Sequence, residues 1–219
     1  MIKKRGRNII IRRDTIKASF LDTSLFDDKV YDEDITRVIV KSDFDFDDDM
    51  GPHFSEYPNL KEYRMAINHS EFEVHDDIMY MRLSEKAIRK SIGWNCGFSD
   101  YNNNVSTQIT EGLVLVCCPP KINHKDIVLH KDCTVIYGSA FEGCDLNSIT
   151  IPSTFRYGCP AAFTNLTVKT LYVPSKHNVF LETSHNNVNK DVIVECIDGD
   201  GATKEKICSW WKSAITGEY

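Results

Sequence analysis

Cysteine and histidine side chains gather in the middle of the sequence, at Cys117, Cys118, His130 and Cys133. Thiolate sulfur and imidazole nitrogen are ligands that zinc prefers, so this group is a hypothetical zinc site. Adjacent residues on a strand, such as Cys117 and Cys118, point to opposite faces of a sheet and chelate one ion poorly. We therefore expect no metal here and interpret these cysteines as small buried apolar residues.

Other patterns that could do chemistry are weak. A cysteine nucleophile needs a lowered thiolate pKa and a pocket, and neither follows from these spacings. The DGDG stretch at 198–201 lacks the later ligands of a calcium loop and favours a turn before a helix. The sequence contains no phosphate-binding glycine loop and no serine elbow. We expect no catalytic residue and no cofactor, with an enzyme or metal-dependent site carried by residues 83–111 as the alternative.

Composition and charge narrow the class of protein. With 219 residues, of which 42% are hydrophobic, the chain can bury a substantial core. The net charge of −6 and a pI of about 5.6 argue against a partner that is nucleic acid or an anionic membrane. Eight cysteines are too few for a disulfide scaffold of this length, so we expect mostly free thiols.

The termini and the charged runs add little evidence about location or function. The apolar run Ile9–Ile11 is shorter than the roughly 7 to 15 residues of a secretory signal, so the chain as written is expected to stay in the cytoplasm. No stretch approaches the about 20 apolar residues of a membrane-spanning helix. The acidic run 42–50 and the basic residues of 1–13 are interpreted as solvated segments, with cation binding or electrostatic docking as alternatives.

A sequence pattern repeats at a fixed distance between residues 138–152 and 160–174. Phe141 matches Phe163 (163 − 141 = 22), and Pro152 matches Pro174 (174 − 152 = 22). The same distance leads back from Ile149 to Ile127 (149 − 127 = 22). A constant period of this size is typical of stacked structural repeats. Residues 35–41 and 59–65 align in the same way at a distance of 25 (60 − 35 = 25).

Each repeat predicts one short strand and one tight return. In SITIP at 148–152 and TLYVP at 170–174 apolar and polar residues alternate, as in a strand with one buried face. Successive strands at this period are expected to form a parallel sheet. The AFEGC and AFTNL segments at 140–144 and 162–166 are expected to form the opposite wall, where each phenylalanine fills the core.

The remaining segments predict a hairpin, an insertion and two caps. Residues 72–80 alternate around a turn at Asp76 and Asp77, and 112–120 supplies a returning strand beyond an inserted segment at 83–111. We expect a single domain over 1–219, with an N-terminal cap at 1–34, repeats at 35–174 and a C-terminal cap at 175–219. A C-terminal helix is expected to cover the last coil with Ile207, Trp210, Trp211 and Ala214.

The segment GSAFEGCDLNSITIPSTF at 138–155, together with the hairpin FEVHDDIMY and the later LVLVCCPP, resembles the BspA-type leucine-rich repeat family. The resemblance implies an α/β repeat fold. The implied fold is a right-handed leucine-rich-repeat solenoid with short parallel strands on the concave face and irregular turns on the convex side. It also has a β-hairpin-like insertion and a C-terminal capping helix. Members are mostly bacterial surface or secreted proteins. The resemblance thus implies a non-enzymatic module that binds a protein, such as a host or cell-surface component, or a glycan.

Strand positions that point outward are the best candidates for binding. If the coils stack in register, one row contains Val128, Thr150 and Tyr172, continued by Arg64, and its neighbour contains Asp126, Ser148 and Thr170. The insertion offers a second candidate in Trp94, Phe98 and Tyr101, because aromatic residues on loops often anchor interfaces. An ordinary solvated sheet face, and a structural assembly element that uses the end faces of the stack, are the alternatives. The sequence does not indicate an oligomeric state.

Overall fold

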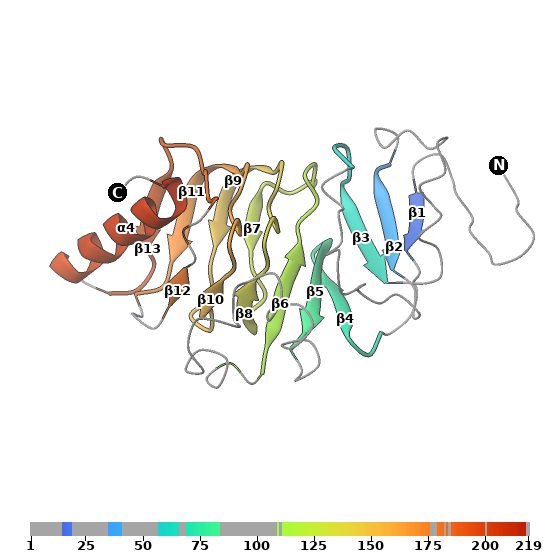
Figure 1. The fold of residues 1–219 in the computed structure, drawn as a ribbon, viewed down its shortest axis with the longest axis horizontal. Coiled ribbons are helices and arrows are strands. Elements are labelled where there is room, and N and C mark those ends of the chain that lie inside the picture. The colour runs from blue at the N-terminus through green and yellow to red at the C-terminus, as the bar shows by residue number, and fades with distance from the viewer. Residues whose placement is uncertain are drawn as a thin grey trace, which may run out of the picture.

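The coils form an elongated stack, with the first strands at one end and a single labelled helix at the other (Figure 1). The computed structural model describes residues 15–18, 35–40, 57–65, 69–83, 109, 111–175, 179–181, 183, 185–199 and 201–217. Within these ranges the strands form three sheets. The predicted leucine-rich-repeat solenoid is confirmed.

A four-stranded parallel sheet forms one wall of the stack, in the order β13-β11-β9-β7. Its strands are β7 (Asp126–Val128), β9 (Asp145–Thr150), β11 (Thr167–Val173) and β13 (Ile193–Cys196). Ile127 pairs with Ile149, and Ile149 pairs with Leu171. The sequence period of 22 residues is therefore the register of the ladder.

A six-stranded sheet forms the opposite wall, in the order β12-β10-β8-β6-β5-β4. Its strands are β4 (Phe72–His75), β5 (Ile78–Arg82), β6 (Leu113–Cys117), β8 (Cys133–Ile136), β10 (Tyr157–Gly158) and β12 (Phe180–Leu181). The turns expected on this wall lie at 138–143 and 160–165. The short parallel strands β8, β10 and β12 on this wall are an addition that the repeat pattern did not predict.

The third sheet has the order β1-β2-β3 and lies toward the N-terminus. It consists of β1 (Thr15–Ala18), β2 (Arg37–Val40) and β3 (Glu62–Met65). Val38 pairs with Tyr63 and Val40 with Met65, as the offset of 25 predicts. Strand β1 pairs in parallel with β2, so the segment expected to be a cap contributes a strand to the stack.

The β4–β5 hairpin turns at Asp76 and Asp77, whose φ angles are 48° and 62°. Aspartate adopts the left-handed backbone conformation more readily than most residues. This explains why the hairpin can turn without a glycine. The carbonyl of Asp77 accepts a hydrogen bond from the backbone N–H of Tyr63 at 3.1 Å. The tip of the hairpin is thereby attached to β3.

Two apolar cores lie on the two faces of the hairpin and the strand that follows it. Ile78 and Tyr80 belong to the core shared with the four-stranded sheet, whereas Met79 and Met81 belong to the core shared with Val38 and the rest of the N-terminal sheet. Strand β6 divides its residues between the two cores in the same way. Burial on both faces explains the uninterrupted apolar sequence LVLVC.

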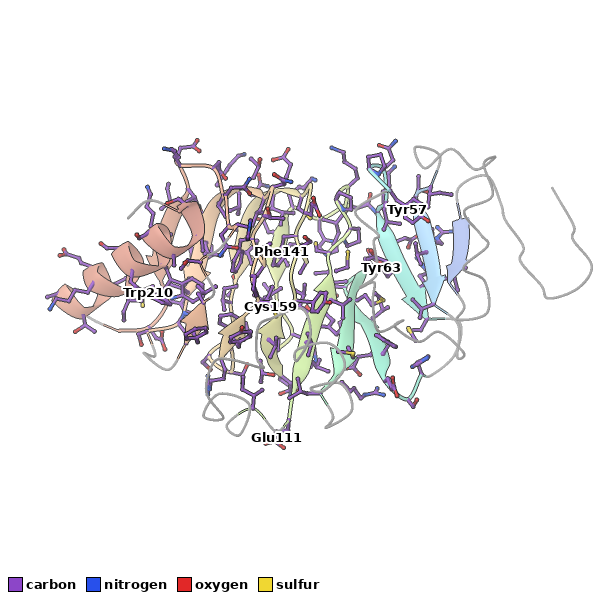
Figure 2. The ribbon with its side chains drawn as sticks, in the orientation of Figure 1. Tyr57, Tyr63, Glu111, Phe141, Cys159 and Trp210 are labelled. Atoms are coloured by element: carbon purple, nitrogen blue, oxygen red, sulfur yellow. The ribbon has the colours of Figure 1, made fainter. Side chains whose placement is uncertain are left out.

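Aromatic side chains fill the repeats and their C-terminal cap. The ring of Phe141, labelled in Figure 2, stacks on that of Phe163 with centroids 5.9 Å apart, so successive coils contact each other through equivalent residues. Helix α4 (Gly201–Thr216) buries Ile207, Trp211, Ala214 and Ile215, the spacing of one helical face. Trp210 was wrongly predicted to cover the coil: it is 44% exposed, because it lies about 100° around the helix from Trp211.

Replacing Gly112 by alanine is expected to destabilise the start of β6. Gly112 has a φ of +120°, and a Cβ there would lie 2.8 Å from the Asp132 carbonyl oxygen and 2.6 Å from Thr134 Cγ2. Backbone strain in this region costs about 1–3 kcal/mol. Urea denaturation should show a larger decrease in the free energy of unfolding for Gly112→Ala than for Gly201→Ala. Gly201 is a matched control, because it has a φ of +47° and open space around the new methyl group. Equal losses in the two variants would contradict the close approach.

Candidate interaction surface

The outward side chains of the four-stranded sheet form two neighbouring rows. In the first row Val128 pairs with Thr150, and Thr150 pairs with Tyr172. In the second row Asp126 pairs with Ser148, and Ser148 pairs with Thr170. These are the six strand positions that the sequence placed together. Their alignment follows from the equal length of the coils that carry them.

Side chains within these rows contact one another from strand to strand. Ser148 donates a hydrogen bond from its hydroxyl to Asp126 Oδ1 at 2.7 Å. Lys169 donates from Nζ to Asn147 Oδ1 at 3.0 Å, next to the second row. Thr150 and Tyr172 are half-buried. The centre of the face is therefore a continuous surface of hydroxyl groups and one aromatic ring.

Strand β13 extends both rows with residues that the sequence reasoning missed. Ile193 pairs with Thr170, and Glu195 pairs with Tyr172. The distance here is 23 residues (193 − 170 = 23), one more than in the preceding coils, which hides the match from a search at a constant period. The available signal in DVIVEC at 191–196 was the alternation of Val192, Val194 and Cys196 with Asp191 and Glu195.

Two large apolar side chains are exposed at opposite ends of this face. Val128 on β7 is 67% exposed and Ile193 on β13 is 55% exposed. Both strands are the edges of the sheet. The charged side chains of its strands are Asp126, Asp145, Glu195 and Lys169, which gives a net charge of −2 (1 − 3 = −2). The face thus combines apolar ends with an excess of negative charge.

Arg64 lies apart from these rows. It is on β3 of the N-terminal sheet, where it pairs with Ile39, and no ladder in the described part of the chain joins β3 to β7. Its guanidinium binds Glu62, which also accepts from Arg37. Burial raises the pKa of Glu62, but the hydrogen bonds from the two arginines outweigh this effect and leave its pKa below the ordinary value. Arg64 is therefore a member of an ion-pair network between β2 and β3.

The second group of candidate residues cannot be placed. Trp94, Phe98 and Tyr101 lie outside the residues that the structure describes, as does the acidic run 42–50. The role of the insertion at 83–111 stays a prediction.

The cysteines considered for zinc are separate buried thiols. Cys117 belongs to one core and Cys118 to the other, as expected for neighbours on a strand. Cys117 accepts a hydrogen bond from the hydroxyl of Tyr63 at 3.0 Å. Among the described residues no group of three or more His, Cys, Asp or Glu side chains is arranged to hold a metal ion. His130 instead stacks on His75 of the hairpin, with ring centroids 4.4 Å apart.

Most cysteines in the described ranges are free, as expected. The free thiols are Cys117, Cys118, Cys133, Cys144, Cys196 and Cys208. Cys159 is the exception, because it is disulfide-bonded, and its partner is not among these six. In the same ranges, no helix combines the length and the apolar character needed to cross a lipid bilayer.

Comparison with known proteins found one family model and two solved structures. A family model described as "BspA type Leucine rich repeat region (6 copies)" matches residues 118–194. No curated protein matches the chain. A leucine-rich repeat protein from Eubacterium ventriosum ATCC 27560 is similar in structure, with 14% identity and a TM-score of 0.44 over 74% of this chain and 37% of that one. A leucine rich cell surface protein from Faecalibacterium prausnitzii A2-165 has 11% identity and a TM-score of 0.30 over 85% of this chain and 55% of that one.

The parallel four-stranded sheet, the period of 22 residues and the stacked phenylalanines define a leucine-rich-repeat solenoid. The similarity to the BspA-type leucine-rich repeat region covers residues 118–194. The chain spans 37% and 55% of the lengths of the two similar structures. Leucine-rich repeat proteins are typically non-enzymatic and often mediate protein interactions.

Proposed function

We propose that this protein is a non-enzymatic interaction module that binds a protein partner through the outer face of the four-stranded sheet. The observation that carries the proposal is the in-register pair of rows that runs across four consecutive strands. Repeat proteins use extended surfaces of this kind for recognition. A regular ladder fixes the spacing of the side chains, so a partner can engage several coils at once.

The chemistry of the face indicates the kind of partner. Val128 and Ile193 offer apolar contacts at the two ends, and Thr150 and Tyr172 offer hydroxyl groups between them. Because the charged side chains of the strands sum to −2, a partner that presents basic side chains around an apolar centre is favoured over an acidic one. Tyrosine at the centre of a face is a residue type enriched at binding hot spots.

The test compares the wild type with a Thr150→Arg/Tyr172→Ala variant. Partners are captured on immobilised protein from lysate and from cell-surface material, identified by mass spectrometry, and measured again in purified form. We expect the variant to weaken binding of a basic partner by at least tenfold, since a new arginine repels it and a central ring is lost. Circular dichroism must show that both proteins are equally folded.

A matched control replaces a hydroxyl residue by arginine and an aromatic residue by alanine on the exposed face of α4, as Ser209→Arg/Trp210→Ala. This control is expected to bind like the wild type. Equal binding by all three proteins would reject the proposed face. A captured glycan in place of a protein would reject the partner class while leaving the face in use.

A further inference from the structure

Two free cysteines from neighbouring coils lie close together inside the stack. Cys118 directly follows the last residue of β6, and Cys144 directly precedes the first residue of β9. Cys118 is 1% exposed and Cys144 is 2% exposed, and both belong to the core that is shared with the four-stranded sheet. Cys117, the neighbour of Cys118 in the sequence, lies in the other core.

Backbone hydrogen bonds hold the two cysteines in place. The backbone N–H of Cys118 donates to the carbonyl oxygen of Ala140 at 2.7 Å, within the turn that leads to Cys144. The backbone N–H of Cys144 donates to the carbonyl oxygen of Phe141 at 3.0 Å and so closes that turn. The end of β6 and the turn before β9 are therefore packed side by side, the arrangement of two backbones that a disulfide requires.

The two sulfur atoms lie against the same backbone oxygen. The Sγ atom of Cys144 is 3.6 Å from the carbonyl oxygen of Pro119, and the Sγ atom of Cys118 is 3.9 Å from it. The Sγ atom of Cys144 is also 3.6 Å from the carbonyl oxygen of Cys118. Burial raises the pKa of Cys118, and a hydrogen bond with the Cys144 thiol raises this pKa further. The two thiols are thus direct neighbours.

Another cysteine of the same stack is already oxidised. Cys159, which is 0% exposed and lies inside the stack (Figure 2), is disulfide-bonded. Disulfides form and persist in oxidising environments. Conditions that produce the bond at Cys159 therefore also allow a second pair of neighbouring thiols to be oxidised.

We infer that Cys118 and Cys144 form a further disulfide when the chain folds in the presence of a low-molecular-weight disulfide, such as oxidised glutathione. In this exchange the S–S bond of the small disulfide breaks, and one S–S bond forms between the two Sγ atoms. The two protons of the protein thiols pass to the two sulfur atoms of the small molecule, which leaves as two thiols. The new bond ties β6 of the six-stranded sheet to β9 of the four-stranded sheet and so links the two walls.

The exchange has to take place before the coil closes. Only a thiolate attacks a disulfide, and burial disfavours the thiolate of Cys118 in the folded protein. The test therefore refolds the full chain from urea in a mixture of reduced and oxidised glutathione. Remaining thiols are blocked with N-ethylmaleimide, and the links are mapped by tandem mass spectrometry. We expect a link between Cys118 and Cys144 in most of the sample. Two blocked thiols, or a link from either cysteine to a different one, would overturn the inference.

Cys117→Ala is the matched control, because it truncates the adjacent buried thiol on the opposite face of the chain. This variant should form the link like the wild type, whereas Cys118→Ala should not form it.

The link should also appear in the stability of the protein. A disulfide that closes a loop of this length (144 − 118 = 26) restricts the unfolded chain. The midpoint of thermal unfolding should therefore rise on oxidation by about 5–10 °C more in the wild type than in Cys118→Ala. Equal rises in the two proteins would count against the link. If Cys118→Ala does not fold, the map of the wild-type protein is sufficient.

Discussion

Phe141→Ala is expected to lower the free energy of unfolding by about 3–5 kcal/mol, the usual cost of truncating a fully buried phenylalanine. Phe141 is 0% exposed and stacks on Phe163, which is also 0% exposed. Removing the ring leaves a cavity between two coils that the stacked backbone cannot close. Since each coil is stabilised mainly by its neighbours, the loss should appear in the main unfolding transition. Urea denaturation followed by circular dichroism measures it.

Phe180→Ala is the matched control for this prediction. Phe180 also stacks on an aromatic ring, that of Tyr157 at 5.5 Å, but it is 38% exposed. Truncating it should cost clearly less, because water can replace part of the lost contact. If the two variants were destabilised equally, the Phe141 ring would not be the core contact between coils.

Raising the pH from about 8 to about 11 is expected to destabilise the fold strongly, because buried thiols resist ionisation in the native state. Burial raises the pKa of Cys117 to about 12 and that of Cys133 to about 12. In the unfolded chain a thiol ionises near pH 8.5. The stabilisation is complete below that value and is lost as the pH rises toward the pKa of the folded state.

The size of this effect follows from the number of protons lost on unfolding. Each thiol that ionises only in the unfolded chain lowers the free energy of unfolding by about 1.4 kcal/mol for every pH unit above its unfolded pKa. Two such thiols would remove several kcal/mol by pH 11. The check is a series of urea denaturations across this pH range, in which Cys117→Val and Cys133→Val should each reduce the slope of stability against pH.

Cys208→Ala supplies the comparison for the alkaline prediction. Cys208 is a free, half-buried thiol on α4, outside the set of fully buried cysteines. This variant should leave most of the slope in place. A slope that does not change when Cys117 and Cys133 are replaced would show that other groups, such as the tyrosines, cause the alkaline loss.

Much of the candidate surface could be predicted because it depends on a regular distance along the chain. Residues 22 apart occupy equivalent places in successive coils, so Thr150 and Tyr172 had to align once the coils stacked. The prediction for Arg64 did not hold in the same way. The coils before β7 differ in length, and the tip of the hairpin is hydrogen-bonded to β3 through Asp77 and Tyr63. The row of outward side chains on the four-stranded sheet therefore does not continue from β7 to β3, since no ladder in the described part of the chain joins these two strands.

The sequence by itself determined the stacked repeat, the register of β7, β9 and β11, the hairpin turn and the terminal helix. Each of these features depends on local alternation or on a constant spacing. Tertiary structure alone decided the short strands of the opposite wall, the division of the core by the hairpin and the addition of β13 to the surface. A strand of two residues, such as Tyr157–Gly158, has no periodicity to detect, and burial on a second face depends on packing against residues distant in the sequence.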